Sequence, residues 1–171
     1  PSKPEANYIT APVKRTDLEQ TVLATGMIKP YKQVDVGAQV TGEIKSLNVQ
    51  LGQTVHKGDL LAVIDPRTQK NTLQTAQAQL NSNQANLEKA QLDFKRQQTM
   101  LKEGATSKEN YDNAKAALAA AKASVEQSRV SVDSAKLSLG YTQVIAPIDG
   151  VVVSLPVEEG QTINANQSSP T

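Results

Sequence analysis

The sequence predicts an α+β protein in which a long antiparallel helical hairpin interrupts a small, two-fold repeated β domain. Three observations predict this class. Two similar eighteen-residue segments flank a stretch of different chemistry, that stretch carries apolar residues at every seventh position, and aromatic residues make up only 3% of the chain. With one Phe, four Tyr and no Trp, a wide globular core is disfavoured, whereas Ala, Leu, Val and Gln suit thin helical seams and small β units.

The repeat consists of residues 38–55 and 146–163, which align without a gap. The first copy reads AQVTGEIKSLNVQLGQTV and the second reads APIDGVVVSLPVEEGQTI. Each copy predicts a strand, a glycine turn and a second strand. Because one such unit cannot bury its apolar face, we expect the two copies to face each other as a small sandwich. The matched residues include Gly42 and Gly150, and the turns Gly52-Gln53-Thr54 and Gly160-Gln161-Thr162.

Between the two copies, residues 66–140 predict two helices that pair as a coiled coil. Large apolar residues recur every seven positions, with a small or polar residue three places after most of them. The large positions are Leu73, Leu80, Leu87, Phe94 and Leu101, then Tyr111, Leu118, Val125, Val132 and Leu139. The partners are Ala76, Asn83 and Ala90, then Ala114, Ala121, Ser128 and Ala135. A short tip at residues 102–108 makes the helices antiparallel, and each arm extends roughly 50 Å at ~1.5 Å per residue.

Capping signals set the expected ends of both helices. Asp65, which is followed by proline, predicts the N-cap of the first helix, and Gly140 is typical of a helix C-terminus. At the tip, Gly104 is expected to end the first helix. Thr106 and Glu109 have the spacing of a capping box for the second helix.

Residues 1–33 belong to neither copy of the repeat. They contain two strand-like pieces, Tyr8–Val13 and Thr21–Ile28, which we assign with a linker to part of an adjoining β domain. Residues 166–171 are expected to begin the remaining segment of that domain. The chain starts at Pro1 without Met, and no apolar run approaches the ~20 residues that span a bilayer. We therefore expect a piece of a longer protein, with a signal peptide or membrane anchor outside it.

Composition disfavours several classes of function. Eighteen basic and seventeen acidic residues leave a net charge of +1, and no basic stripe alternates with aromatic residues, which argues against nucleic-acid binding. The absence of cysteine excludes disulfides and thiolate metal sites. The single histidine, His56, lies in a predicted turn without a second metal ligand at a useful spacing. No phosphate loop or nucleophile elbow occurs. We predict no enzyme activity, no metal and no cofactor.

The repeated β unit resembles the biotinyl and lipoyl carrier fold, with residues 34–65 and 141–165 as its two half-motifs. Such carriers present a modifiable lysine at the turn between the halves. Here that turn follows Leu60–Asp65 and is occupied by the helical insertion, and neither Met-Lys-Met nor Asp-Lys-Ala occurs there. A carrier is therefore the poorer interpretation. A coiled-coil spacer without a specific tip is a further alternative.

A lipoyl-like domain split by a helical hairpin resembles the periplasmic adaptor proteins, or membrane fusion proteins, of bacterial tripartite efflux pumps. The resemblance covers residues 8–171 and is sharpest at Val34–Gly42 and Tyr141–Gly150, which are most similar to the MacA branch. It implies that residues 1–33 and 166–171 belong to a partial, membrane-proximal β-barrel domain. It also implies a periplasmic protein anchored to the inner membrane that forms homo-oligomers, hexameric in this branch. It also implies contact of the β domains with an inner-membrane, MacB-like ABC transporter, and of the tip with a TolC-type outer-membrane channel. The implied role is a sealed conduit for export of macrolide-like drugs.

In this family a tip motif of Arg, Leu and Ser is implicated in channel binding. Its spacing is met by Arg96, Met100 and Ser107, and Met fills the space of the usual Leu. Arg96 and Met100 are neighbours on one helix face and Ser107 begins the returning helix, so we expect one patch. The adjoining tip residues assigned to it are Leu101, Gly104 and Thr106. The alternative is a solvated Arg, a Met at the seam edge and a Ser that only caps the helix.

The outer faces of both predicted helices are polar with little charge, and include Gln77, Gln84, Gln91, Ala117, Ser124 and Ser131. Solvated helices usually carry more alternating charge, so these faces favour side-by-side packing of neighbouring copies in a ring. A polar surface that only contacts solvent is the alternative. The turn of Glu158, Glu159 and Gln161 is expected to line the lumen of such a ring; paired carboxylates on one tight turn do not indicate acid/base chemistry.

Overall fold

The computed structural model describes residues 4–5, 7–29 and 31–165, and the chain divides into two units, Pro1–Gln33 and Val34–Thr171. In the described part of the second unit, three strands precede two helices and three strands follow them. The order is β1 (Gly42–Leu47), β2 (Thr54–Val55), β3 (Leu60–Ile64), α1 (Arg67–Lys102), α2 (Lys108–Gly140), β4 (Gln143–Ile145), β5 (Gly150–Val151) and β6 (Thr162–Ile163). The predicted α+β class is confirmed. Neither described helix combines the length and apolar character that crossing a bilayer requires.

The first unit has no helix or strand among its described residues, and their side chains are exposed. The predicted strands Tyr8–Val13 and Thr21–Ile28 are therefore wrong for this structure. A strand needs a hydrogen-bonded neighbour and a face to bury, and no described strand pairs with either segment. The assignment of residues 1–33 to a β-barrel domain stays a prediction, and the predicted barrel segment 166–171 lies outside the described residues.

The strands of the second unit pair antiparallel in two sheets. Among the described residues, one sheet has the order β4-β3-β1-β6 and the other consists of β2 and β5. Each sheet therefore contains strands from both sides of the helical insertion. Along the chain, the helical hairpin follows β3 and precedes β4, and these two strands are neighbours in the larger sheet.

The strand register reproduces the two-fold repeat of the sequence. The first strand of each copy pairs with the second strand of the other copy, β1 with β6 and β5 with β2. When the two sequence copies are aligned, each residue pair in one ladder corresponds to a residue pair in the other ladder. The pairs are Gly42–Ile163 and Glu43–Thr162 in one ladder, and Gly150–Val55 and Val151–Thr54 in the other.

The glycine turns after the first strand of each copy also match. Gly52 and Gly160 have positive φ angles of 81° and 83°, a region in which other residues are strained. Gly52 N–H donates to the Val152 carbonyl, and Gly160 N–H donates to the equivalent Ile44 carbonyl, both at 2.8 Å. These turns therefore explain why glycine stands at both places in the repeat.

The core of the β unit is small and lies between the two copies. Ile44 and Ile64 are its largest fully buried side chains. A second group consists of Val49, Val55 and Ala146, against which Leu61, Val152 and Leu155 pack. Residues from both copies thus bury one another, and this packing is consistent with the expected sandwich of two half-motifs.

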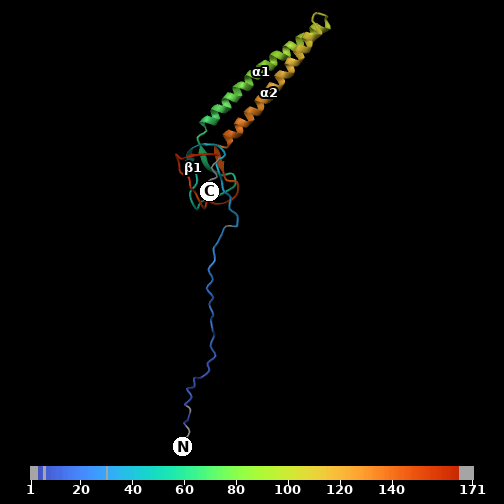
Figure 1. Ribbon diagram of the computed structural model, residues 1–171. Coiled ribbons are helices and arrows are strands. Elements are labelled where there is room, and N and C mark those ends of the chain that lie inside the picture. Colours follow the sequence, from blue (N-terminus) through green and yellow to red (C-terminus); the bar gives the residue numbers. More distant parts are fainter. Residues whose placement is uncertain (1–3, 6, 30, 166–171) are drawn as a thin grey trace. The chain divides into compact units, whose positions relative to one another are not determined.

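The hairpin seam follows the predicted seven-residue spacing. Leu80, Val125 and Val132 form its buried centre, and all the other predicted seam positions are buried or half-buried. One layer is polar: the Asn83 side-chain amide donates to Ser128 Oγ at 2.6 Å. Helices α1 and α2 lie side by side along their lengths (Figure 1). The coiled-coil prediction is therefore confirmed.

Of the two predicted ends at the base of the hairpin, the first needs correction by one residue and the second is at the expected residue. Pro66, rather than Asp65, is the N-cap of α1, although the Asp65 carboxylate accepts from Arg67 N–H at 3.1 Å. The hydrogen-bonded Arg67 guanidinium lowers the pKa of the Asp65 carboxyl group. Gly140 is the last residue of α2, and Tyr141 is the cap. Gly140 does not have the positive φ of a glycine that follows a helix.

Candidate partner-binding site at the hairpin tip

The end of α1 is closed by backbone hydrogen bonds around a glycine. Gly104 has φ +71°, and its N–H donates to the Leu101 carbonyl at 3.2 Å. Ala105 N–H donates to the Met100 carbonyl at 2.8 Å. These two bonds are the Schellman arrangement, in which a glycine reverses the chain and satisfies the last carbonyl groups of a helix. The prediction that Gly104 ends the first helix is confirmed.

The start of α2 differs from the predicted capping box. Ser107, not Thr106, is the N-cap, and its hydroxyl oxygen accepts from Asn110 N–H at 3.1 Å. Thr106 lies one residue too early, and its half-buried hydroxyl instead donates to Gln97 Oε1 at 2.8 Å. Ser107 has the extended backbone of an N-cap, which explains why the serine takes this role.

The predicted channel-binding residues occupy distinct environments at this tip. Arg96 is exposed and forms an ion pair with Asp93 at 3.3 Å, while Met100, one turn later on α1, is half-buried. Ser107 is exposed and is the last residue of the connection 103–107, where it caps α2. Arg96 and Met100 thus share a helix face, and Ser107 lies at the start of the other helix. Of the adjoining residues, Gly104 is exposed, and Leu101 and Thr106 are half-buried.

Three tip residues with structural roles were not among the predicted site residues. Gln97 and Asn110 both hydrogen-bond to Thr106, and Asp93 orients Arg96. A signal for Gln97 was present, because it continues the series of seam partners seven residues after Ala90. Spacing alone gives no indication of which polar group a side chain at that position meets.

Replacing Gly104 with alanine should destabilise the hairpin by roughly 1 kcal/mol, because a Cβ is strained at its positive φ. The matched control is Gly140→Ala, at the end of α2, where φ is not positive and no atom lies within 4 Å of an added Cβ. Thermal unfolding followed by helical circular dichroism measures both variants. Equal effects of the two substitutions would contradict the role assigned to Gly104.

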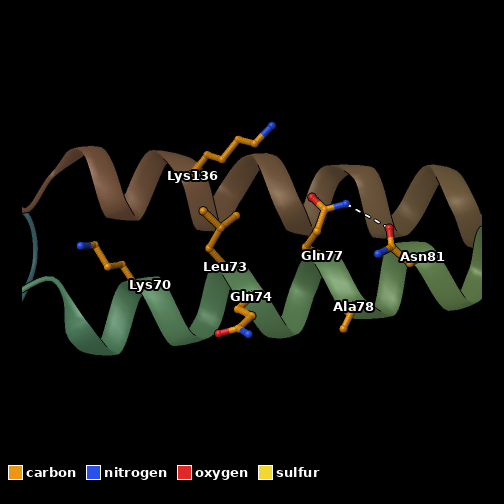
Figure 2. Close-up of a pocket in the computed structure, with 7 residues that line it drawn as sticks. All are labelled: Lys70, Leu73, Gln74, Gln77, Ala78, Asn81 and Lys136. Carbon is orange, nitrogen blue, oxygen red and sulfur yellow. Dashed lines mark hydrogen bonds between the residues drawn. The ribbon is translucent and has the colours of Figure 1, made fainter.

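A second surface lies near the base of the hairpin. A shallow groove runs along α1 and is lined by Lys70, Leu73, Gln74, Gln77, Ala78, Asn81 and, from α2, Lys136 (Figure 2). Within it the Gln77 amide donates to Asn81 Oδ1 at 3.2 Å. The groove contains part of the polar outer face predicted from the sequence, with a lysine from each helix beside it. Its exposed lining is mostly apolar, with the amide and ammonium groups beside it.

The turn predicted to line a lumen has hydrogen bonds within the β unit. The Glu159 carboxylate accepts from Leu47 N–H at 2.8 Å, and Gln161 Oε1 accepts from Glu158 N–H at 3.2 Å. Gln53 makes the equivalent bond in the first copy, to Gln50 N–H at 2.9 Å. Glu159 and Gln161 therefore stabilise the turn itself, whichever surface it faces.

The described residues show no group of three or more potential metal ligands. His56 lies in an exposed turn, where its backbone N–H donates to the Asp59 carboxylate at 2.8 Å. This contact is the common structural role of a turn aspartate.

Comparison with known proteins gives a consistent set of relatives. A family model described as RND MFP, barrel-sandwich hybrid domain, matches residues 32–171. The pyoverdine export membrane fusion protein PvdR of Pseudomonas putida is 45% identical, over 94% of this chain and 45% of its own length. The macrolide export protein MacA of Yersinia pestis is 40% identical, over 96% of this chain and 48% of its own. The chain therefore spans about half the length of these curated relatives.

Solved structures agree with the sequence relatives. The crystal structure of MacA from Actinobacillus actinomycetemcomitans matches with a TM-score of 0.67 and 44% identity, covering 82% of this chain and 48% of that one. The crystal structure of ZneB from Cupriavidus metallidurans matches with a TM-score of 0.52 and 25% identity, covering 80% and 42%. Each match covers about four fifths of this chain.

Proposed function

The chain belongs to the family of RND membrane fusion proteins, and we propose that it forms the hairpin-bearing part of an adaptor that bridges an inner-membrane transporter and an outer-membrane channel. The observation that carries this proposal is the tip. A connection held by a Schellman turn, a serine cap and a threonine hydrogen bond presents an exposed arginine at the end of a long coiled coil. A helix pair that served only as a spacer would also need the two caps, so the exposed Arg96 beside this fixed connection is the feature that favours a binding tip.

The partner proposed at the tip is a TolC-type outer-membrane channel. Arg96 supplies a guanidinium for paired hydrogen bonds to carbonyl or carboxylate groups, and Met100 supplies an adaptable apolar contact. Ser107 has its hydroxyl oxygen engaged by Asn110 N–H, which leaves its hydroxyl hydrogen for a partner acceptor. These groups match the small number of central residues that dominate many interfaces.

The partner proposed at the other end is an inner-membrane ABC transporter of the MacB type, contacted through β domains. Macrolide-like drugs are the proposed cargo, since relatives named as macrolide export proteins are 36% to 40% identical to this chain. Export of a pyoverdine-like siderophore is a second candidate, because a relative named for pyoverdine export is 45% identical. The interrupted β unit is compatible with either cargo.

We further propose a periplasmic location with an inner-membrane anchor, and a ring of copies, hexameric as in the MacA branch, that encloses a sealed conduit. The polar outer faces of the hairpin support lateral packing, and the groove of Lys70, Asn81 and Lys136 offers one such contact surface. In this ring the turn of Glu158, Glu159 and Gln161 borders the lumen. Its internal hydrogen bonds support a fixed turn.

A lipoyl-type carrier remains the alternative from another class. It needs a modified lysine between the half-motifs, where this chain instead has α1 and α2. The intact mass of the native protein distinguishes the two functions, because a carrier shows the added mass of a prosthetic group. An adaptor shows the mass of the unmodified chain.

Arg96→Ala should weaken binding of a purified TolC-type channel by roughly tenfold or more, and should lower drug resistance of the host cell. Met100→Ala should weaken binding less, because the side chain is already half-buried in the hairpin. Ser107→Asn preserves the helix cap while it changes the group offered to the channel. Binding is measured by surface plasmon resonance with the intact protein.

The matched control for Arg96 is Arg129→Ala. Arg129 is 59% exposed and pairs with Glu126 at 3.6 Å, which closely resembles the 65% exposed Arg96 and its partner Asp93 at 3.3 Å. Arg129 lies in the middle of α2, away from the tip. If Arg96→Ala and Arg129→Ala leave binding equally unchanged, the tip assignment is wrong.

A further inference from the structure

The tip contains a short chain of side-chain hydrogen bonds that crosses between the two helices. Asn110 Nδ2 donates to Thr106 Oγ1 at 3.4 Å, and the Thr106 hydroxyl donates to Gln97 Oε1 at 2.8 Å. The Thr106 hydroxyl thus accepts one bond and donates one. We call these three residues, Gln97, Thr106 and Asn110, the tip latch.

The position of Gln97 makes this arrangement specific. It is half-buried at a seam position one turn after Phe94, whose ring lies 5.4 Å from that of Tyr111 on α2. A polar amide in a seam loses hydration, and that loss is offset only when the amide finds a partner. Thr106 is that partner, and it is half-buried as well. For packing alone, an apolar residue at position 97 would fill the seam equally well.

The other described bonds of the connection act within one helix end each. The bonds of Gly104 and Ala105 hold the connection to α1, and the Ser107 cap holds it to α2. The bond from Thr106 to Gln97 joins the two sides. Gln97 directly follows Arg96 in sequence, and Thr106 directly precedes Ser107. The latch therefore ties together the immediate neighbours of two proposed channel contacts.

We propose that Gln97 and Asn110 are positioning residues which, through Thr106, hold residues 103–107 in the conformation that docks on the outer-membrane channel. This inference rests on the proposed function of the tip. A loop held in its bound conformation avoids the ordering cost that a free loop meets on binding. Loss of the latch through Gln97 should therefore weaken binding without changing any side chain assigned to the channel-binding patch.

The test compares Thr106→Val, which removes the hydroxyl from a side chain of nearly the same shape, with Thr106→Ser, which keeps it. Gln97→Met removes the acceptor, and Gln97→Glu keeps it. Two quantities are measured on the intact protein: hydrogen exchange of the backbone amides of residues 103–107, and affinity for a purified TolC-type channel. Ser128→Ala is the matched control, because it deletes a polar seam contact with Asn83 far from the tip.

We expect Thr106→Val and Gln97→Met to accelerate amide exchange at the tip and to weaken channel binding roughly three- to tenfold, the loss of about one hydrogen bond. Thr106→Ser and Gln97→Glu should keep amide exchange and channel affinity closer to those of the unsubstituted protein. Ser128→Ala should change neither the amide exchange of residues 103–107 nor the channel affinity. Helical circular dichroism confirms that each variant keeps the hairpin.

Three other outcomes would overturn the inference. Unchanged exchange at residues 103–107 in Thr106→Val and Gln97→Met would show that no latch operates. Faster exchange with unchanged binding, while Arg96→Ala still weakens binding, would remove the positioning role and leave the proposed function intact. Unchanged binding in both Thr106→Val and Arg96→Ala would remove the proposed tip function and this inference together.

Discussion

Ile64→Ala is expected to lower the free energy of unfolding of the β unit by roughly 2–5 kcal/mol, the range for deletion of a fully buried aliphatic side chain. Ile64 is 0% exposed, ends β3 and has few neighbours able to collapse into the space it leaves, because the core is small. Its N–H also donates to the Thr142 carbonyl at 2.7 Å, where the chain returns from the hairpin. Urea unfolding followed by a β-unit probe measures the loss.

The matched control is Ile145→Ala in β4. Ile145 is also an isoleucine in the larger sheet, but its side chain is 54% exposed, so its deletion should cost about 1 kcal/mol or less. Similar losses in the two variants would show that Ile64 is not the centre of this core.

Gly42→Ala should destabilise the β unit by roughly 1–3 kcal/mol through overpacking. A Cβ at position 42 would lie 2.6 Å from Ile64 Cγ2, closer than unbonded carbon atoms approach. Ile64 is buried and branched at Cβ, so this methyl group cannot turn away without moving the strand. Thermal and urea unfolding of the variant measure the effect.

The repeat provides the control for this variant. Gly150 is the two-fold equivalent of Gly42, but an added Cβ there meets nothing within 4 Å. Gly150→Ala should therefore change stability by only about 0.5 kcal/mol in either direction. The double variant Gly42→Ala, Ile64→Ala should lose less than the sum of its parts, because alanine at position 64 removes the clashing methyl group. Equal losses at the two glycines would refute the clash.

The sequence predicted well the features that depend on the periodicity of residues within one segment. The seven-residue spacing of Leu80, Val125 and Val132 identifies the seam, because a helical stripe is determined by residues within the same segment. The repeat identified the two half-motifs because corresponding strands meet equivalent partners, as the matching ladders of β1 with β6 and β5 with β2 demonstrate. The fold class follows from these two patterns.

The features that failed depend on partners that a single sequence segment does not specify. Tyr8–Val13 and Thr21–Ile28 have the composition of strands, yet a strand forms only against a neighbour. At the tip, Ser107 and Thr106 are both good capping residues, and only the backbone decides that Ser107 caps while Thr106 bonds to Gln97. The position of the hairpin tip was predictable, but the hydrogen bonds within it were not.

The pairing of strands across the inserted hairpin affects how this domain is synthesised. β1 and β2 leave the ribosome long before β6 and β5, their partners, have been translated. The intervening helices fold from contacts that are closer in sequence, and their pairing brings the two ends of the insertion together, which lowers the entropy cost of closing so long a loop. Until then the edges of the early strands are open to pairing with other chains. Slow or faulty hairpin formation should therefore appear first as aggregation of the nascent β unit.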